Sequence, residues 1–249
     1  MTVFPDTSEQ RQVARARAES LQTYARIAGV LFLLSLVAGG FGEAYAPSKL
    51  IVSTSAAMTA ENLRRFDSLF RIGFASYLVE ALCDVALAWV LYVLLRPVQK
   101  DIALLAAFFG LVSTALFGFA ELFYFSSSLV LRDADYLKSF SPEQRNTLAL
   151  LSLKIYGLGG GAFMAFYGVA SLLRGYLMFR SGYLPKFLGV ILALAGLGFV
   201  TRNFLLVLAP AYASGLLLLP VFVAILSLTV WFLAKGVDVR KLEERAAFD

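Results

Sequence analysis

Six charged side chains lie inside or at the edges of long apolar stretches of the sequence: Glu43, Glu80, Asp84, Glu121, Lys154 and Arg202. A charge at the centre of a bilayer costs roughly 2.5–3.5 kcal/mol on insertion scales, so each group requires a partner, water or a bound ligand. Glu80 and Asp84 are four residues apart, which places both carboxyls on one helix face. Such carboxyls can hold a proton or a cation, and Arg202 would tune them or receive an anionic group.

Other kinds of chemistry have little support in the sequence. Histidine is absent and Cys83 is the one cysteine, which removes the usual ligands of zinc, haem and iron–sulfur clusters and the usual nucleophile pairs. No phosphate-binding loop with its lysine is present. We therefore expect no catalytic residue, no metal site and no cofactor, and we expect that the protein is not an enzyme.

The elements that must position these charges are membrane helices. Apolar residues make up 59% of the chain and charged residues 16%, whereas a soluble domain has about 45–50% apolar residues. Continuous apolar runs predict an all-α polytopic membrane protein, a bundle of six transmembrane helices. The predicted spans are Ile27–Ala46, Ile72–Leu95, Ile102–Phe125, Ile155–Leu173, Phe187–Ala209 and Gly215–Ala234. Pro220 falls within the last span and predicts a bend there.

Lysine and arginine gather in the segments that would be cytoplasmic if both termini lie inside, which favours that orientation. The expected organisation is a basic lead-in over 1–25, a transmembrane domain over 26–235 and a charged tail over 236–249. Residues 8–23 predict either an interfacial basic helix or a solvated segment. A retained first span is favoured over a cleaved signal, because Pro47 follows the small residues that precede it.

Two of the outer segments carry helix signals. Thr59 is a suitable cap for an amphipathic run with Leu63, Phe66 and Phe70 on one stripe. Ser141–Gln144 (SPEQ) has the serine, proline and glutamine of a capping box, which predicts that the fourth helix begins there.

Small residues indicate close helix packing. Gly157 and Gly161 form one small-xxx-small pair, and Gly189 with Ala193 forms another. A broken helix that lines a site is the alternative interpretation of the glycine-rich stretch.

Two interpretations of the charged patch remain open. At about 1.5 Å per helical residue, Asp84 lies near the bilayer centre and the other groups lie in the outer half. In the structural interpretation, Arg202 or Lys154 pairs with Glu80, Asp84 or Glu121 and fixes helix packing. In the functional interpretation, an outward-facing polar cavity binds a small ligand, a cation or a proton. Glu80 and Asp84 are then its deepest groups, and Glu121 and Glu43 line its entry.

One stretch, Gly175–Val200 (GYLMFRSGYLPKFLGVILALAGLGFV), resembles the bacterial membrane family catalogued as domain of unknown function 4386. Arg26–Gly39, Leu69–Val98 and Leu105–Leu111 are similar to the same family, so the resemblance covers about residues 25–235. It implies a multi-helix protein of the bacterial inner membrane. It implies no activity, substrate or catalytic residue.

The leading expectation is a non-enzymatic protein of the bacterial plasma membrane that binds or transports a small ligand, cation or proton. The alternative is a membrane interaction or regulatory protein whose charges only hold helices together and whose cytoplasmic ends, including Val237–Arg245, contact a partner or lipid. The lipid bilayer is the expected surrounding, a nucleic-acid partner is not expected, and the sequence identifies no protein partner.

Overall fold

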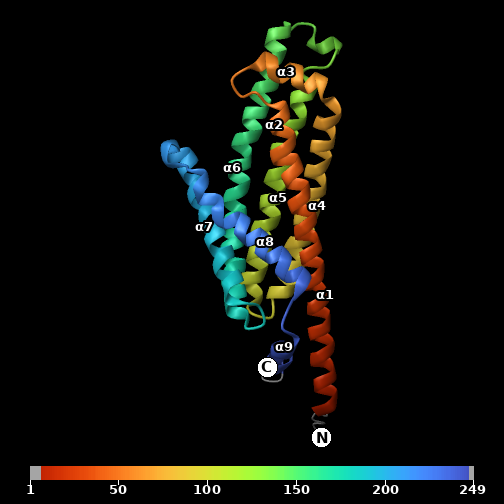
Figure 1. Cartoon of the computed structure of the whole chain (residues 1–249), viewed down its shortest axis with the longest axis vertical. Coiled ribbons are helices and arrows are strands. Elements are labelled where there is room, and N and C mark those ends of the chain that lie inside the picture. The colour runs from red at the N-terminus through yellow and green to blue at the C-terminus, as the bar shows by residue number, and fades with distance from the viewer. Residues whose placement is uncertain (1–6, 247–249) are drawn as a thin grey trace. The chain divides into compact units, whose positions relative to one another are not determined.

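The computed structural model describes residues 7–246, and every regular element within that range is a helix (Figure 1). The α-helices are α1 (Thr7–Gly39), α2 (Ala46–Leu50), α3 (Ala56–Arg65), α4 (Asp67–Leu95), α5 (Lys100–Leu129), α6 (Pro142–Ser181), α7 (Lys186–Leu208), α8 (Leu219–Ala234) and α9 (Val239–Ala246). A π-helical segment, η1 (Gly40–Tyr45), joins α1 to α2. Short 3-10 turns are η2 (Asp135–Leu137), η3 (Pro210–Tyr212) and η4 (Gly215–Leu218).

Within the described residues, six helices are long and apolar enough to cross a membrane. They are Ala18–Leu50, Asp67–Leu95, Lys100–Leu129, Pro142–Ser181, Lys186–Leu208 and Gly215–Ala234. The prediction of an all-α protein with six transmembrane helices is therefore confirmed. The apolar runs marked only the lipid-facing part of each helix, so most of the helices extend beyond the predicted spans.

The first helix is longer than its apolar run because nothing interrupts it. No glycine or proline occurs between Thr7 and Ala28, so α1 continues from the basic lead-in into the first span. The segment over 8–23, predicted as an interfacial helix or a solvated segment, is thus part of α1 within the described residues.

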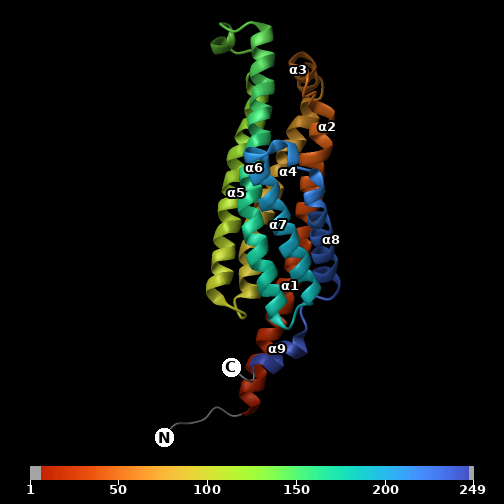
Figure 2. The same ribbon diagram turned by 90° about the vertical axis from the view of Figure 1, so that its left-hand side faces the viewer.

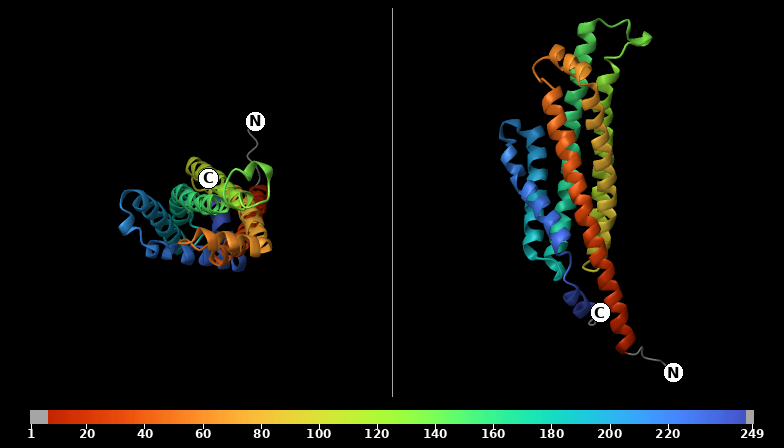
Figure 3. Two further views of the ribbon diagram at one scale, coloured as in Figure 1. Left: turned by 90° about the horizontal axis from the view of Figure 1, so that it is seen from above. Right: turned by 45° about the vertical axis from the view of Figure 1, so that its right-hand side comes forward.

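The chain divides into two compact units, each built from separate stretches of sequence. Unit 1 comprises residues 1–33, 86–110 and 167–249, of which the structure describes 7–33, 86–110 and 167–246. Unit 2 comprises 34–85 and 111–166. In unit 2, parts of α1, α4, α5 and α6 run alongside one another, as the right-hand view of Figure 3 shows.

Unit 1 contains a close contact between α6 and α7, which lie side by side with α8 in Figure 2. A Cβ placed on Gly189 would lie 2.6 Å from the Gly175 carbonyl oxygen, and one on Gly196 would lie 2.5 Å from the Gly168 oxygen. Only glycine permits this backbone approach, so the prediction of close packing at Gly189 is confirmed. At Gly157, by contrast, no atom of the described residues lies within 4 Å of an added Cβ, so no close packing depends on this glycine and the prediction at this position is wrong.

Two local predictions are corrected and one is confirmed. Pro220 lies in the first turn of α8, after η4. A backbone N–H at this position would have no partner within the helix, so proline begins this helix rather than bending it. The cap of α3 is Ser55 rather than the predicted Thr59. Ser55 is the last extended residue before the helix, and its hydroxyl accepts a hydrogen bond from the Met58 N–H. Thr59 is buried and hydrogen-bonded to Val52. At α6, the Ser141 hydroxyl accepts from the Gln144 N–H and the Gln144 side chain accepts from the Ser141 N–H, as a capping box requires.

Candidate functional site

Four of the predicted carboxyl residues gather in unit 2. Glu43 comes from η1, Glu80 and Asp84 from α4, and Glu121 from α5. Glu80 lies within electrostatic range of the other three carboxyls, and Glu43 lies within range of Asp84 and Glu121. We call these four residues the acidic cluster.

Glycines on α1 and η1 allow these elements to approach α4 closely. A Cβ on Gly39 would lie 2.7 Å from Oε1 of Glu80, so this glycine leaves the space that the carboxyl occupies. A Cβ on Gly42 would lie 3.1 Å from the Gly73 carbonyl oxygen. The widened π-turn η1 begins directly after Gly39 and carries Glu43. Single π-helical turns inside α-helices occur frequently at functional sites.

Three tyrosines pack beside the acidic cluster in the same unit. The rings of Tyr77, Tyr124 and Tyr156 contact one another edge to face, with centroid distances of 5.2, 5.3 and 6.0 Å. The hydroxyls of Tyr77 and Tyr156 share a hydrogen bond of 2.8 Å. All three tyrosines lie within electrostatic range of Glu121. The tyrosines therefore add hydroxyl groups to the surroundings of the cluster.

Several polar atoms of the site are buried without a hydrogen-bond partner among the described residues. Both carboxyl oxygens of Glu121 are in this state, and that residue is only 5% exposed. The hydroxyl of Tyr124, which is 0% exposed, and Oε2 of Glu80 also have no partner. Buried polar groups are nearly always hydrogen-bonded, so these atoms are exceptions among the described residues.

Exposure changes across the acidic cluster. Glu121 is buried, Glu80 and Asp84 are half-buried, and Glu43 is exposed. The hydroxyl of Ser35 donates to Asp84 over 3.5 Å, a long contact from α1. The cluster thus has a buried end at Glu121 and an exposed end at Glu43.

The predicted basic partners do not neutralise the cluster within unit 2. The side chain of Lys154 is exposed and forms no ion pair with a described residue of either unit. Arg202 belongs to unit 1, on α7, where its buried Nε has no hydrogen-bond partner among the described residues. The structure therefore brings Glu43, Glu80, Asp84 and Glu121 together and does not pair Lys154 with them.

The carboxyls of the acidic cluster are not arranged as a metal-ligand set. Among the described residues, no group of three or more carboxyl or cysteine side chains is placed to hold a metal ion. Divalent ions such as Ca²⁺ need six or more oxygen ligands. A proton needs only one carboxyl oxygen, whereas a metal ion of either charge would need further oxygen ligands such as backbone carbonyls, hydroxyls or water.

The sequence contained a signal for two of the tyrosines. Tyr77 precedes Glu80 by three residues and Tyr124 follows Glu121 by three, so each shares a helix face with its carboxyl. Tyr156 and the π-turn η1 give no comparable signal. Arg174, which follows the predicted fourth span on α6, is 5% exposed and lies in space that Gly110 leaves open.

One family of known proteins matches most of the chain. The family described as domain of unknown function 4386 matches residues 27–236. The chain belongs to this family. The chain is also similar to an uncharacterised protein of Archaeoglobus fulgidus. The two are 30% identical over 166 residues, and the match covers 65% of this chain and 80% of that protein. No solved structure matches the chain.

Proposed function

We propose that this membrane protein binds, and moves across or into the membrane, a proton or a monovalent cation held by the acidic cluster of unit 2. Glu121 is the central group, Glu80 and Asp84 share the charge, and Glu43 lies at the exposed end. The role is non-enzymatic. The setting that we propose is the bacterial plasma membrane, with both termini in the cytoplasm, as the distribution of basic residues supports.

The burial of Glu121 carries this proposal. A carboxylate that is 5% exposed and has no hydrogen-bond partner on either oxygen is too costly to leave charged and alone. A proton or cation removes that cost, and the unpaired hydroxyl of Tyr124 offers an additional oxygen ligand. Ionisable groups kept inside membrane segments despite this cost usually serve ion or proton pathways.

Reaction with dicyclohexylcarbodiimide tests the proposal, because this apolar reagent attacks protonated carboxyls in apolar surroundings. The protein in lipid nanodiscs is labelled across pH, with added Na⁺, K⁺ or tetramethylammonium, and the adduct on each carboxyl is measured by mass spectrometry. N-methylglucamine chloride keeps the ionic strength constant. We expect Glu121 to be labelled. If the site binds a cation, one small cation should protect Glu121 from the reagent. If it binds a proton, labelling should fall only as the pH rises.

A matched pair of variants separates binding from packing. Without added cation, and at a pH high enough to ionise Glu121, Glu121→Gln should raise the free energy of unfolding by about 1 kcal/mol, because it removes a buried charge that has no partner. It should also abolish any stabilisation by cations. Glu61→Gln makes the same change on an exposed residue of α3 and should alter neither quantity. If Glu121→Gln simply lowers the stability and no cation or pH changes the labelling, the carboxyls are structural and the search moves to protein partners.

A further inference from the structure

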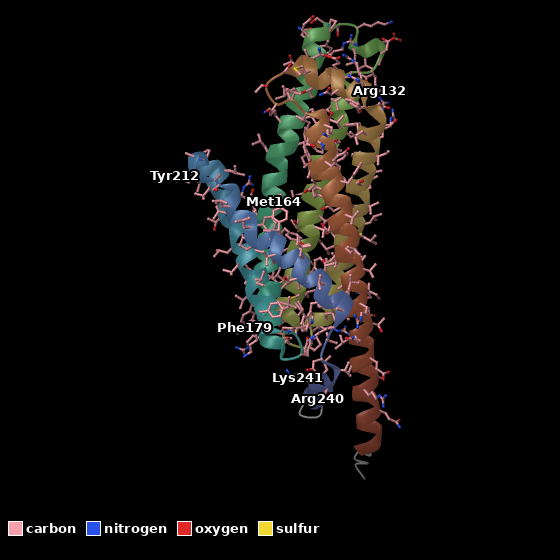
Figure 4. All side chains as sticks on the ribbon, in the orientation of Figure 1. Arg132, Met164, Phe179, Tyr212, Arg240 and Lys241 are labelled. Carbon is pink, nitrogen blue, oxygen red and sulfur yellow. The ribbon has the colours of Figure 1, made fainter. Side chains whose placement is uncertain are left out.

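Unit 1 contains a second polar site, distinct from the acidic cluster and independent of its proposed role. A pocket of about 420 Å³ lies between the loop joining α6 to α7 and the segment joining α8 to α9. Its lining combines two lysines, one aspartate and two aromatic residues with small loop residues: Gly182, Tyr183, Leu184, Pro185, Trp231, Lys235, Gly236, Val237, Asp238 and Lys241. We call it the lysine pocket. Figure 4 labels Lys241 on α9, at the end of unit 1 opposite Tyr212.

The two connecting segments are held in fixed positions. Gly182 and Gly236 have φ values of 78° and 72°, which end α6 and α8 in a conformation that favours glycine. The Asp238 N–H donates to the Tyr183 carbonyl over 3.0 Å, and the Trp231 indole N–H donates to the Gly236 carbonyl over 2.8 Å. The pocket is therefore formed by hydrogen-bonded backbone rather than by side chains alone.

The charges of the lysine pocket are arranged for an anion. The Lys235 ammonium lies 5.1 Å from the centre of the Trp231 ring, which places it above an aromatic face. The Lys241 ammonium lies 3.7 Å from Oδ2 of Asp238, a long ion pair that leaves the pocket with one net positive charge. Asp238 also accepts a hydrogen bond from the Lys241 N–H at the start of α9, so it has a local structural role.

The position of the pocket identifies the anion that it meets. The membrane-spanning helices that border it end at Ser181 and Ala234, and the next begins at Lys186, so almost all of the lining residues lie in the segments that connect these helices at one end. Trp231 lies in the last turn of its span, the depth at which aromatic side chains meet lipid headgroups. Basic pockets between helices at this depth bind the phosphates of anionic lipids.

We infer that the lysine pocket binds the phosphate of an anionic phospholipid headgroup, with Lys235 and Lys241 as its cationic ligands and Trp231 beside the glycerol and upper acyl chain. Asp238 weakens this binding because its negative charge partly cancels the positive charge of Lys241. The site thereby ties the ends of α6, α7, α8 and α9 to the lipid surface.

The two tryptophans of the chain, Trp89 and Trp231, allow a direct test. In a Trp89→Phe background, the fluorescence of Trp231 is measured in nanodiscs in which dibrominated phosphatidylglycerol replaces phosphatidylcholine stepwise. Quenching gives the binding constant of phosphatidylglycerol relative to phosphatidylcholine beside the pocket. We expect a preference that falls about fivefold for each lysine changed to glutamine, Lys235→Gln or Lys241→Gln.

Two further variants keep the test independent of folding defects. Asp238→Asn keeps an oxygen to cap α9 but removes the negative charge, so it should strengthen the preference by roughly threefold. The variant Lys100→Gln removes the same single charge as either lysine change but lies outside the pocket, and it should have no effect. An equal response to both lipids in the Trp89→Phe protein overturns the inference. A second result would also overturn it: inorganic phosphate abolishes the preference for phosphatidylglycerol while Asp238→Asn leaves that preference unchanged. This result would assign the pocket to free phosphate and overturn the lipid as its occupant.

Discussion

Units 1 and 2 take residues from the same long helices α1, α4, α5 and α6 but pack them by different means. In unit 1, α6 and α7 meet backbone to backbone, since Gly175 faces Gly189 and Gly168 faces Gly196. Contact of this kind stabilises helix pairs in lipid through dispersion, and it requires no polar side chain. In unit 2, tyrosine rings and carboxyls fill the space between helices, and Glu121 and the Tyr124 hydroxyl lack partners.

This comparison supports the proposal that a ligand binds in unit 2. The glycine contact of unit 1 is complete without any further molecule, because backbone atoms meet backbone atoms. The carboxyls of unit 2 gain no comparable contact and leave buried oxygens unsatisfied. The proposed role of the acidic cluster, binding a proton or cation, would account for these unsatisfied oxygens, whereas a purely structural role would not.

The largest expected effect is on the glycine contact of unit 1. Gly189→Ala should lower the free energy of unfolding by about 3 kcal/mol, because the new Cβ would lie 2.6 Å from the Gly175 oxygen and from the Phe179 nitrogen, both backbone atoms. Gly157→Ala in unit 2 meets no atom within 4 Å and should leave the stability unchanged or raise it by about 0.5–1 kcal/mol, since alanine favours the helix. Stability can be measured by thermal unfolding in detergent. Equal losses in both variants would remove the contrast between the units.

An intermediate effect is expected among the tyrosines of unit 2. Tyr77→Phe removes the 2.8 Å hydrogen bond to Tyr156 and should lower the free energy of unfolding by about 1 kcal/mol. Tyr124→Phe removes a buried hydroxyl without a partner and should leave the stability unchanged or higher in the absence of cation. The proposed site predicts that Tyr124→Phe nevertheless weakens protection of Glu121 from carbodiimide. Unchanged protection would exclude the Tyr124 hydroxyl as a ligand.

The smallest effect on stability is expected at the contact between α1 and α4. Gly39→Ala would place a Cβ 2.7 Å from Oε1 of Glu80, the movable end of a side chain, so the free energy of unfolding should fall by less than about 1 kcal/mol. The displaced carboxyl should still change the response to cations. Gly40→Ala is the matched control, because nothing lies within 4 Å of its added Cβ. If both variants bind cations like the unchanged protein, Glu80 is not part of the site.

Much of the fold could be predicted from local patterns. A run of apolar residues about 20 long has few alternatives to a membrane helix, so the six spans were found and Gly215–Ala234 was placed without error. The capping box at Ser141 was equally readable, because its hydrogen bonds join residues three positions apart. The cap of α3 was misplaced, since both Ser55 and Thr59 have suitable hydroxyls and only the extended backbone at Ser55 distinguishes them.

For the candidate site, the sequence by itself determined which groups are costly to bury and that Glu80 and Asp84 share a helix face. Only the tertiary structure decided that Glu43 and Glu121 join them, that Lys154 does not pair with them, and that three tyrosines lie alongside. The physical reason is the distance along the chain between the residues that make each contact. Helix periodicity fixes neighbours within about one turn, whereas contacts between helices depend on where glycines such as Gly39 and Gly42 let two backbones approach.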